Sequence, residues 1–320
     1  MNLGAARRWC TLLMMSAPAA GRPSPARGRL LAALLLLSCR QALVAQSATR
    51  FSAAKVDKAT VASLPTRHAR TARIIAHVDL TRPFATRTQW TFVAASLPGS
   101  RRNAAGETVR NWGVAVCFVD GLTPRCGFPM PGKESRLYRF GATVHLYVAK
   151  VVFAGANGRN PLLLVKTFGA YGGDGGHAIY TQVFAYDGLR NRFKLIFSNG
   201  TGSNNNQETR FVRSGPLRGD IIVARPTQSA PFAYWISVYT WNAQHPYSHR
   251  TLRFRSATRY GDGNSLAVID SEMPDILERF GKWKPGDPLP APQYLPRWCG
   301  RPFFIRRGEE WCTQDRQPSQ

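Results

Sequence analysis

The chain is short of acidic residues. It has 18 Asp and Glu against 43 Lys and Arg, which gives a formal net charge of +25 at pH 7. Such an excess of positive charge attracts anions, which include nucleic acid, anionic lipid head groups and acidic glycans. Because the charges are scattered along the chain, the same excess also sets solubility and non-specific adhesion. Charge therefore indicates anionic partners without naming one.

The common catalytic signatures are also missing. The sequence has no Gly-x-Ser-x-Gly elbow, no His-Glu-x-x-His helix and no glycine-rich phosphate loop before a helix. Its cysteines lack the spacing of a zinc site, so no metal is predicted. The best catalytic candidate is the glycine-rich segment with Asp174 and His177, where the carboxylate could orient the imidazole for base chemistry. These absences favour a protein without catalysis, and an envelope hydrolase that uses Asp174 and His177 is the alternative.

No apolar run is long enough to cross a bilayer, which takes about 20 residues. The run at 30–37 follows Arg27 and Arg29 and precedes small residues, a pattern typical of a secretory signal peptide at 1–45 that is cleaved after Ala45. The alternative is lipidation of Cys39, which alone would attach the protein to a membrane. Cleavage leaves 320 − 45 = 275 residues and, without six arginines, a charge of (43 − 6) − 18 = +19. We expect a periplasmic or secreted protein.

Helical periodicity is nearly absent. Apolar residues alternate with polar ones at 144–148, short aliphatic runs occur at 162–165 and 221–223, and Gly, Asn, Asp and Pro clusters separate such segments. One short helix is predicted near 274–280, with Pro274 at its start and Gly281 after its end. The pattern predicts an all-β fold.

Cysteines and a repeat predict two disulfides. Four cysteines remain after cleavage, and an even number in an exported chain favours disulfides. Residues 116–128 align with 183–195, and a looser copy covers 238–247. A two-residue turn at Gly121 and Leu122 places Cys117 opposite Cys126, which leaves Cys299 to pair with Cys312. The same register in the second copy places Phe184 opposite Phe193.

The chain divides into segments of different composition. After the signal peptide, residues 46–70 are predicted to form a flexible N-terminus, and 71–284 the domain of repeated hairpins. Residues 285–320 form a proline-rich connector and a tail that a disulfide closes on itself.

Four short segments resemble parts of the FG-GAP and VCBS-type β-propeller repeats of bacteria: 171–177, 186–188, 219–224 and 260–264. Blades of those families run from Gly-Asp through an aliphatic strand to a strand that ends in an aromatic residue, Asp or Asn, and Gly. The resemblance implies a small β-propeller-like fold and a role in adhesion, envelope assembly or ligand display. The calcium loop of these families is not present, since the segment around Asp262 has one carboxylate, and no cofactor is predicted. Chain length also fits a two-sheet β-sandwich.

Aromatic and basic residues gather near the last predicted strands. Exposed aromatic rings beside arginines can stack on sugar rings and hold anions. The candidate binding residues are Tyr234, Trp241, Arg253 and Arg255. We expect an exported, disulfide-stabilised protein that binds an anionic envelope polymer or a protein partner, with no specific nucleic acid. A structural subunit of an envelope assembly is a further alternative.

Overall fold

A computed structural model describes much of the chain after residue 49. The chain divides into two compact units, Met1–Ala48 and Thr49–Gln320, and all described residues belong to the second. The described ranges are 50–64, 70–97, 100–102, 108–110, 113–127, 143–155, 157–170, 177–202, 207–227, 232–257, 259, 267–288, 290, 304–306 and 309–311. The predicted signal peptide, Cys39, Cys299, Cys312 and Asp262 lie outside them.

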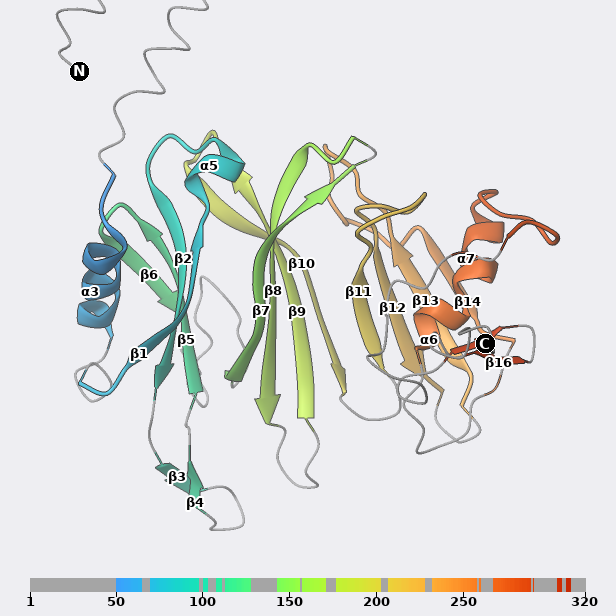
Figure 1. Cartoon of the computed structure of the whole chain (residues 1–320), viewed down its shortest axis with the longest axis horizontal. Coiled ribbons are helices and arrows are strands. Elements are labelled where there is room, and N and C mark those ends of the chain that lie inside the picture. The colour runs from blue at the N-terminus through green and yellow to red at the C-terminus, as the bar shows by residue number, and fades with distance from the viewer. Residues whose placement is uncertain are drawn as a thin grey trace, which may run out of the picture. The chain divides into compact units, whose positions relative to one another are not determined.

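Three four-stranded antiparallel sheets make up most of the fold (Figure 1). The N-terminal sheet has the strand order β1 (Arg73–Asp79), β2 (Trp90–Leu97), β5 (Gly113–Asp120), β6 (Thr123–Gly127). The middle sheet joins β7 (Thr143–Ala154), β8 (Asn160–Ala170), β9 (His177–Asp187) and β10 (Arg192–Gly202). The C-terminal sheet joins β11 (Glu208–Phe211), β12 (Ile221–Pro226), β13 (Tyr234–Tyr239) and β14 (Leu252–Arg255). Two small ribbons pair β3 (Ser100–Arg102) with β4 (Thr108–Arg110) and β15 (Phe304–Arg306) with β16 (Glu309–Trp311).

Helix α3 (Ala53–Ser63) covers one face of the N-terminal sheet. Its buried side chain Val56 packs against Val93 and Val119, and Leu64 just after it packs against Leu97. The structure therefore corrects the expectation of a flexible segment here. The helix forms because residues at helical spacing, Val56 and Thr60, both reach an apolar sheet face.

The other face of the N-terminal sheet packs on the middle sheet. Phe118 forms ring contacts with Phe184, at a centroid distance of 5.1 Å, and with Phe193, also at 5.1 Å. Both faces of β2 and β5 are covered, so these strands are buried along nearly their whole length. Strands buried on both faces are continuous in apolar character rather than alternating.

The middle sheet uses its opposite face against the C-terminal sheet. Leu162, Leu164 and Val183 from the middle sheet form one buried cluster with Ile221 and Val223 from β12. The aliphatic runs recognised in the sequence at 162–165 and 221–223 thus meet in this interface.

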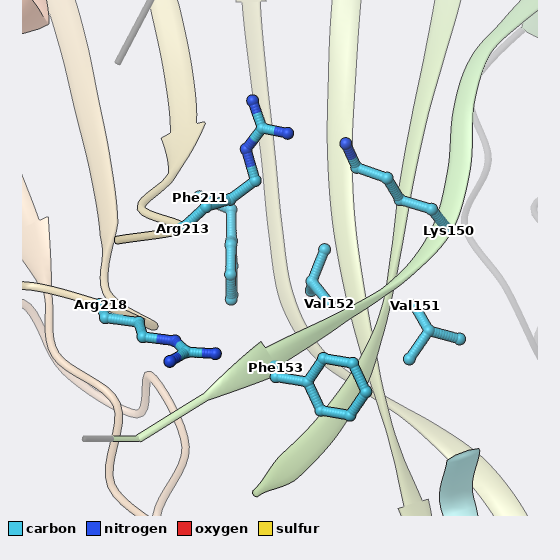
Figure 2. A pocket seen from close by; sticks show the side chains of 7 residues that line it. All are labelled: Lys150, Val151, Val152, Phe153, Phe211, Arg213 and Arg218. Carbon is cyan, nitrogen blue, oxygen red and sulfur yellow. The ribbon is translucent and has the colours of Figure 1, made fainter. Parts of the chain in front are cut away.

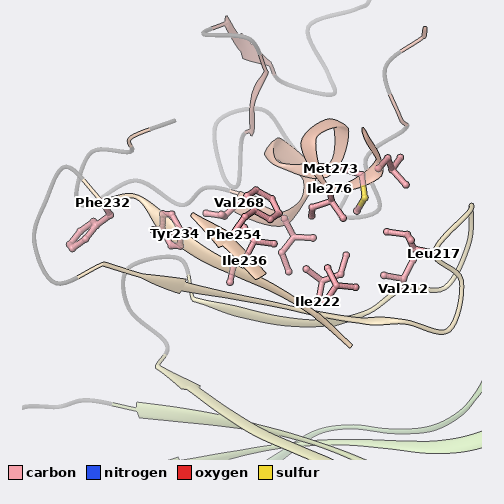
Figure 3. Close-up of a cluster of buried hydrophobic side chains, with 14 residues drawn as sticks. Val212, Leu217, Ile222, Phe232, Tyr234, Ile236, Phe254, Val268, Met273 and Ile276 are labelled. Atoms are coloured by element: carbon pink, nitrogen blue, oxygen red, sulfur yellow. The ribbon is translucent and has the colours of Figure 1, made fainter. Parts of the chain in front are cut away.

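Two short helices cover the far face of the C-terminal sheet: α6 (Val268–Ser271) and α7 (Met273–Arg279). Figure 3 shows Ile222, Ile236 and Phe254 of the sheet packed with Val268 and Ile276 of these helices. Helix α7 matches the predicted helix near 274–280, with Pro274 in its first turn. The sequence pattern did not predict α3, α6 or the single-turn helix α5 (Thr81–Phe84).

The predicted all-β class is confirmed, and the four-stranded sheets described number three, in place of the two sheets of a sandwich. No closed propeller is detected within the described ranges. The outer faces explain this, because a propeller blade packs a neighbouring blade on each face, whereas helices take that place on the first and third sheets here. Within the same ranges, no helix is long and apolar enough to cross a membrane.

The first predicted hairpin is confirmed in register. Cys117 lies opposite Cys126, and the two form a disulfide with a Cα–Cα distance of 4.0 Å. Gly121 has a φ of 60°, as the first central residue of a type II′ turn requires.

The predicted register of the second hairpin is wrong. Phe193 lies opposite Tyr186, not Phe184. The loop is longer because Asp187 Oδ1 accepts hydrogen bonds from the backbone N–H groups of Leu189 and Arg190, at 3.1 and 3.2 Å. Asn191 then closes the turn with a φ of 46°. Asp187 opposes Arg192, so the pairing shifts by two residues.

Candidate functional site

The described residues do not test the predicted catalytic pair of Asp174 and His177. Asp174 lies outside the described residues. His177 is the first residue of β9, where it pairs with Ala170 of β8. The hydrolase hypothesis stays a prediction.

Of the predicted binding residues, two aromatic side chains are directed into the protein. Tyr234 is 0% exposed and belongs to the core between the C-terminal sheet and its helices. Trp241 packs its ring edge-on against Tyr247 at a centroid distance of 5.6 Å, and its backbone N–H donates to Asp220 Oδ1 at 2.9 Å. Tyr234 is therefore closed to a ligand, whereas Trp241 is partly buried against the cluster between the middle and C-terminal sheets.

Arg253 and Arg255 are exposed on β14, and they share a sheet face with Trp235. The Arg253 guanidinium carbon lies 4.4 Å from the Trp235 ring centroid, a cation–π contact. Sequence reasoning recognised the arginines but selected Tyr234 in place of its neighbour. Consecutive strand residues point to opposite faces of a sheet. This alternation indicates that only one of Tyr234 and Trp235 is exposed, and the prediction chose the buried one.

A basic pocket that sequence analysis missed opens between the middle and C-terminal sheets (Figure 2). It has a volume of about 240 Å³. Lys150 comes from β7, while Arg213 and Arg218 come from the connection after β11. In Figure 2 the heads of Lys150 and Arg213 lie in the upper part of the view, and Phe211, Val152 and Arg218 lie below them. Three cations thus surround a partly apolar cavity.

Two close backbone contacts position Arg218. A Cβ atom on Gly158 would lie 2.2 Å from Arg218 Nη2, so the guanidinium occupies the space that a side chain would fill. A Cβ atom on Gly219 would lie 2.7 Å from the backbone N of Gly155. Glycine at both positions lets the β7–β8 turn dock directly on the segment that carries Arg218.

The electrostatics of the pocket show crowded positive charge. Burial lowers the pKa of Lys150, and nearby Arg213 lowers it further. Burial also lowers the pKa of Lys166 on β8, where Glu208 opposes the effect while Arg210 and Lys150 add to it. The charged form of each lysine is therefore less stable here than it is in water. An anion bound nearby would offset the repulsion between the neighbouring cations.

Neighbouring carboxylates serve another cation. Arg210 pairs with Glu208 at 2.6 Å and with Asp270 of α6 at 2.7 Å. Burial alone would lower the pKa of Arg210, but the two carboxylates raise it, so the guanidinium stays charged. Among the described residues, no ion pair engages Lys150, Arg213 or Arg218. The pocket's charge is left for a ligand or solvent.

A buried acid, Asp220, follows the pocket residue Arg218 by two positions. Asp220 is 5% exposed, and burial raises its pKa to about 6, while the hydrogen bond from the Trp241 N–H lowers it. The Tyr247 hydroxyl donates to the carbonyl of Gly219, and burial followed by the charge of Asp220 raises the pKa of Tyr247. These groups hold in place the segment 217–220, which carries Arg218.

The described residues hold no group of three or more His, Cys, Asp or Glu side chains that could bind a metal ion. No family model, curated protein or solved structure matches the chain. The resemblance to propeller repeats therefore stays a prediction, and the functional argument rests on the chain's own geometry.

Proposed function

We propose that this protein binds an anionic ligand, without catalysis, and that the pocket of Lys150, Arg213 and Arg218 holds the anion. The supporting observation is the convergence of three cations on one hollow while the nearby carboxylates pair with Arg210. Guanidinium groups form paired hydrogen bonds to carboxylate and phosphate oxygens, which suits them to this task. The proposal retains export and an envelope ligand as the sequence predicts them.

Pocket size limits the ligand. Sites for whole small molecules commonly span about 300–1,000 Å³, whereas this hollow has about 240 Å³. It fits one phosphate or carboxylate group with a small apolar neighbour against Val152 and Phe211. A polymer would thus insert one unit at a time.

The test is calorimetric titration of the protein with pyrophosphate and with citrate at about 150 mM salt, where exposed charges are largely screened beyond about 8 Å. The double variant Arg213→Ala/Arg218→Ala should weaken binding about tenfold or more, since each lost charge-assisted hydrogen bond contributes about 1.5–3 kcal/mol. The matched control is Arg192→Ala on β10, an exposed arginine outside the pocket.

Two results would contradict the pocket proposal. One is binding that disappears for both probes as salt rises from about 20 to 150 mM, which marks general attraction to a basic surface. The other is an equal loss of affinity in the control. Vesicles containing phosphatidate, added as a third probe, separate a lipid head group from a soluble anion.

A further inference from the structure

The exposed end of the C-terminal sheet carries a row of cations around one indole ring. Trp235 on β13 lies opposite Arg225 on β12 and opposite Arg255 on β14. Directly opposed residues share a sheet face, and adjacent strands lie about 4.8 Å apart, so the row spans about 10 Å. Arg253, two residues before Arg255, lies on the same face and stacks on the indole. These four residues are the Trp235 platform.

The platform is open to solvent. Trp235 is 39% exposed, which is a large fraction for an indole on a sheet, and the three arginines are exposed. Arg225 Nη2 donates to Asn199 Oδ1 and, at 3.2 Å, to the carbonyl of Gly200 on β10. Neither acceptor is charged, and in the described part of the chain no ion pair engages any of the three arginines. The platform's positive charge is uncompensated.

We propose that the Trp235 platform binds a linear acidic polysaccharide, with one sugar ring against the indole and the guanidinium groups on carboxylates or sulfates to either side. An indole face packs well against the apolar face of a sugar ring, and planar guanidinium groups match both kinds of anion. Arg253 is stacked on Trp235 in the structure, and the proposal requires it to leave the ring face for an anion when the sugar binds.

The number of rings favours a polysaccharide over single-stranded nucleic acid. Sites for single strands stack successive bases on several aromatic side chains. Here one exposed ring stands among three cations, because Tyr234 is buried on the opposite face and Tyr239 packs edge-on against Phe197 at 5.2 Å. One exposed ring beside three cations suits a ligand that has many charges and few rings to stack.

The platform differs from the basic pocket in place and in ligand. The pocket is lined by β7, at one edge of the middle sheet, whereas Arg225 of the platform contacts β10, at the other edge. The platform is therefore a second site that goes beyond the proposed function, and substitutions can disable either one alone.

The test is fluorescence anisotropy with a dye-labelled oligogalacturonate and a dye-labelled sulfated oligosaccharide, at about 150 mM salt. Trp235→Ala and, separately, Arg253→Ala/Arg255→Ala should each weaken binding about tenfold, as stacking and paired guanidinium contacts require. The matched controls are Arg192→Ala and the pocket variant Arg213→Ala/Arg218→Ala, both of which should bind as the unsubstituted protein does. Circular dichroism confirms that each variant is folded, and Arg255→Glu gives a second reading if Trp235→Ala unfolds.

Three outcomes would overturn the proposal. Unchanged affinity in Trp235→Ala and Arg255→Glu removes the platform as the site. An equal loss in the pocket variant assigns the polysaccharide to the pocket. Tighter binding of a labelled oligothymidylate, lost in the same platform variants, makes the ligand a nucleic acid instead.

Discussion

At the scale of single residues, Asp220 is a buried acid whose pKa is raised. Burial of its carboxyl raises its pKa to about 6. An unfolded aspartate titrates near about 3.9. Between these two values the folded chain binds the proton and the unfolded chain does not. Stability contributed by this group therefore falls as pH rises from about 4 to 6.

Replacing Asp220 with Asn should remove that part of the pH dependence. The amide keeps an oxygen for the Trp241 N–H but has no charge to bury. We expect the free energy of unfolding of Asp220→Asn to be about 1–2 kcal/mol higher than that of the unsubstituted protein at pH 7, and equal to it near pH 4. The value at pH 7 is smaller than the full pKa shift implies because the site is partly hydrated. Urea unfolding at both pH values measures this. Parallel pH profiles for the two proteins would contradict the assignment.

Residue-level prediction from sequence succeeded where geometry was local and failed where the buried face had to be known. The pairing of Cys117 with Cys126 follows from a two-residue turn, which counts outward without tertiary information. The choice between Tyr234 and Trp235 depends on which face α6 and α7 cover. Helical periodicity is weak in the segments that form α6 and α7. The sequence therefore does not show which face of the C-terminal sheet these helices bury.

At the scale of elements, the contact between the β7–β8 turn and the segment before β12 depends on Gly219. Its φ is 93°, and an added Cβ would meet the backbone of the other turn at 2.7 Å. Gly219→Ala should destabilise the protein by about 3 kcal/mol or more, from backbone strain and from the clash together. Gly215→Ala is the matched control, because Gly215 has a φ of 77° with nothing within 4 Å of its added Cβ.

Thermal and urea unfolding of the two glycine variants separate the cost of backbone strain from the cost of losing the contact between the two turns. Gly215→Ala should lose only the backbone part, about 1 kcal/mol. Gly219→Ala should in addition weaken pyrophosphate binding, since the same segment carries Arg218. Equal losses of stability in the two variants would mean that the turn-to-turn contact contributes nothing.

The two hairpins show why registers are predictable only in part. Gly121 sets the first turn directly. In the second, the side chain of Asp187 folds back on two backbone N–H groups and lengthens the loop. Asn191 then fixes the result by accepting a hydrogen bond from the Trp90 Nε1–H at 3.1 Å, across to the N-terminal sheet. That partner is distant in sequence, so no local pattern predicts it.

At the scale of the described unit, the three sheets and their helices form successive layers joined by apolar clusters. Helix α3 covers the first sheet through Val56, which is 0% exposed. The basic pocket joins β7 of the second layer to the segment after β11 of the third, two elements far apart in sequence. The Trp235 platform lies on the consecutive strands β12, β13 and β14 and contacts the second layer through Arg225 and β10. Sequence analysis could predict the strands and the excess of arginine, but not this meeting of layers.

Removing the α3 contact should destabilise the whole unit and expose the first sheet. Val56→Asp places a charge among Val93, Cys117 and Val119, and we expect a loss of about 3 kcal/mol together with self-association through the uncovered face. Ala54→Asp adds the same charge at an exposed position of the helix and serves as the control. Urea unfolding and light scattering measure the two effects. A monomeric Val56→Asp of unchanged stability would show that α3 is dispensable.

The middle sheet is enclosed on both faces, and this determines how fast its amide hydrogens exchange with solvent. Amide hydrogens at 162–165 lie between two apolar clusters, so water reaches them only when a neighbouring layer separates. Strand β1, at the edge and alternately exposed, can exchange its hydrogens by local fraying. A single deuterium-exchange experiment would thus read slow opening of the layers from one strand and rapid surface motion from another.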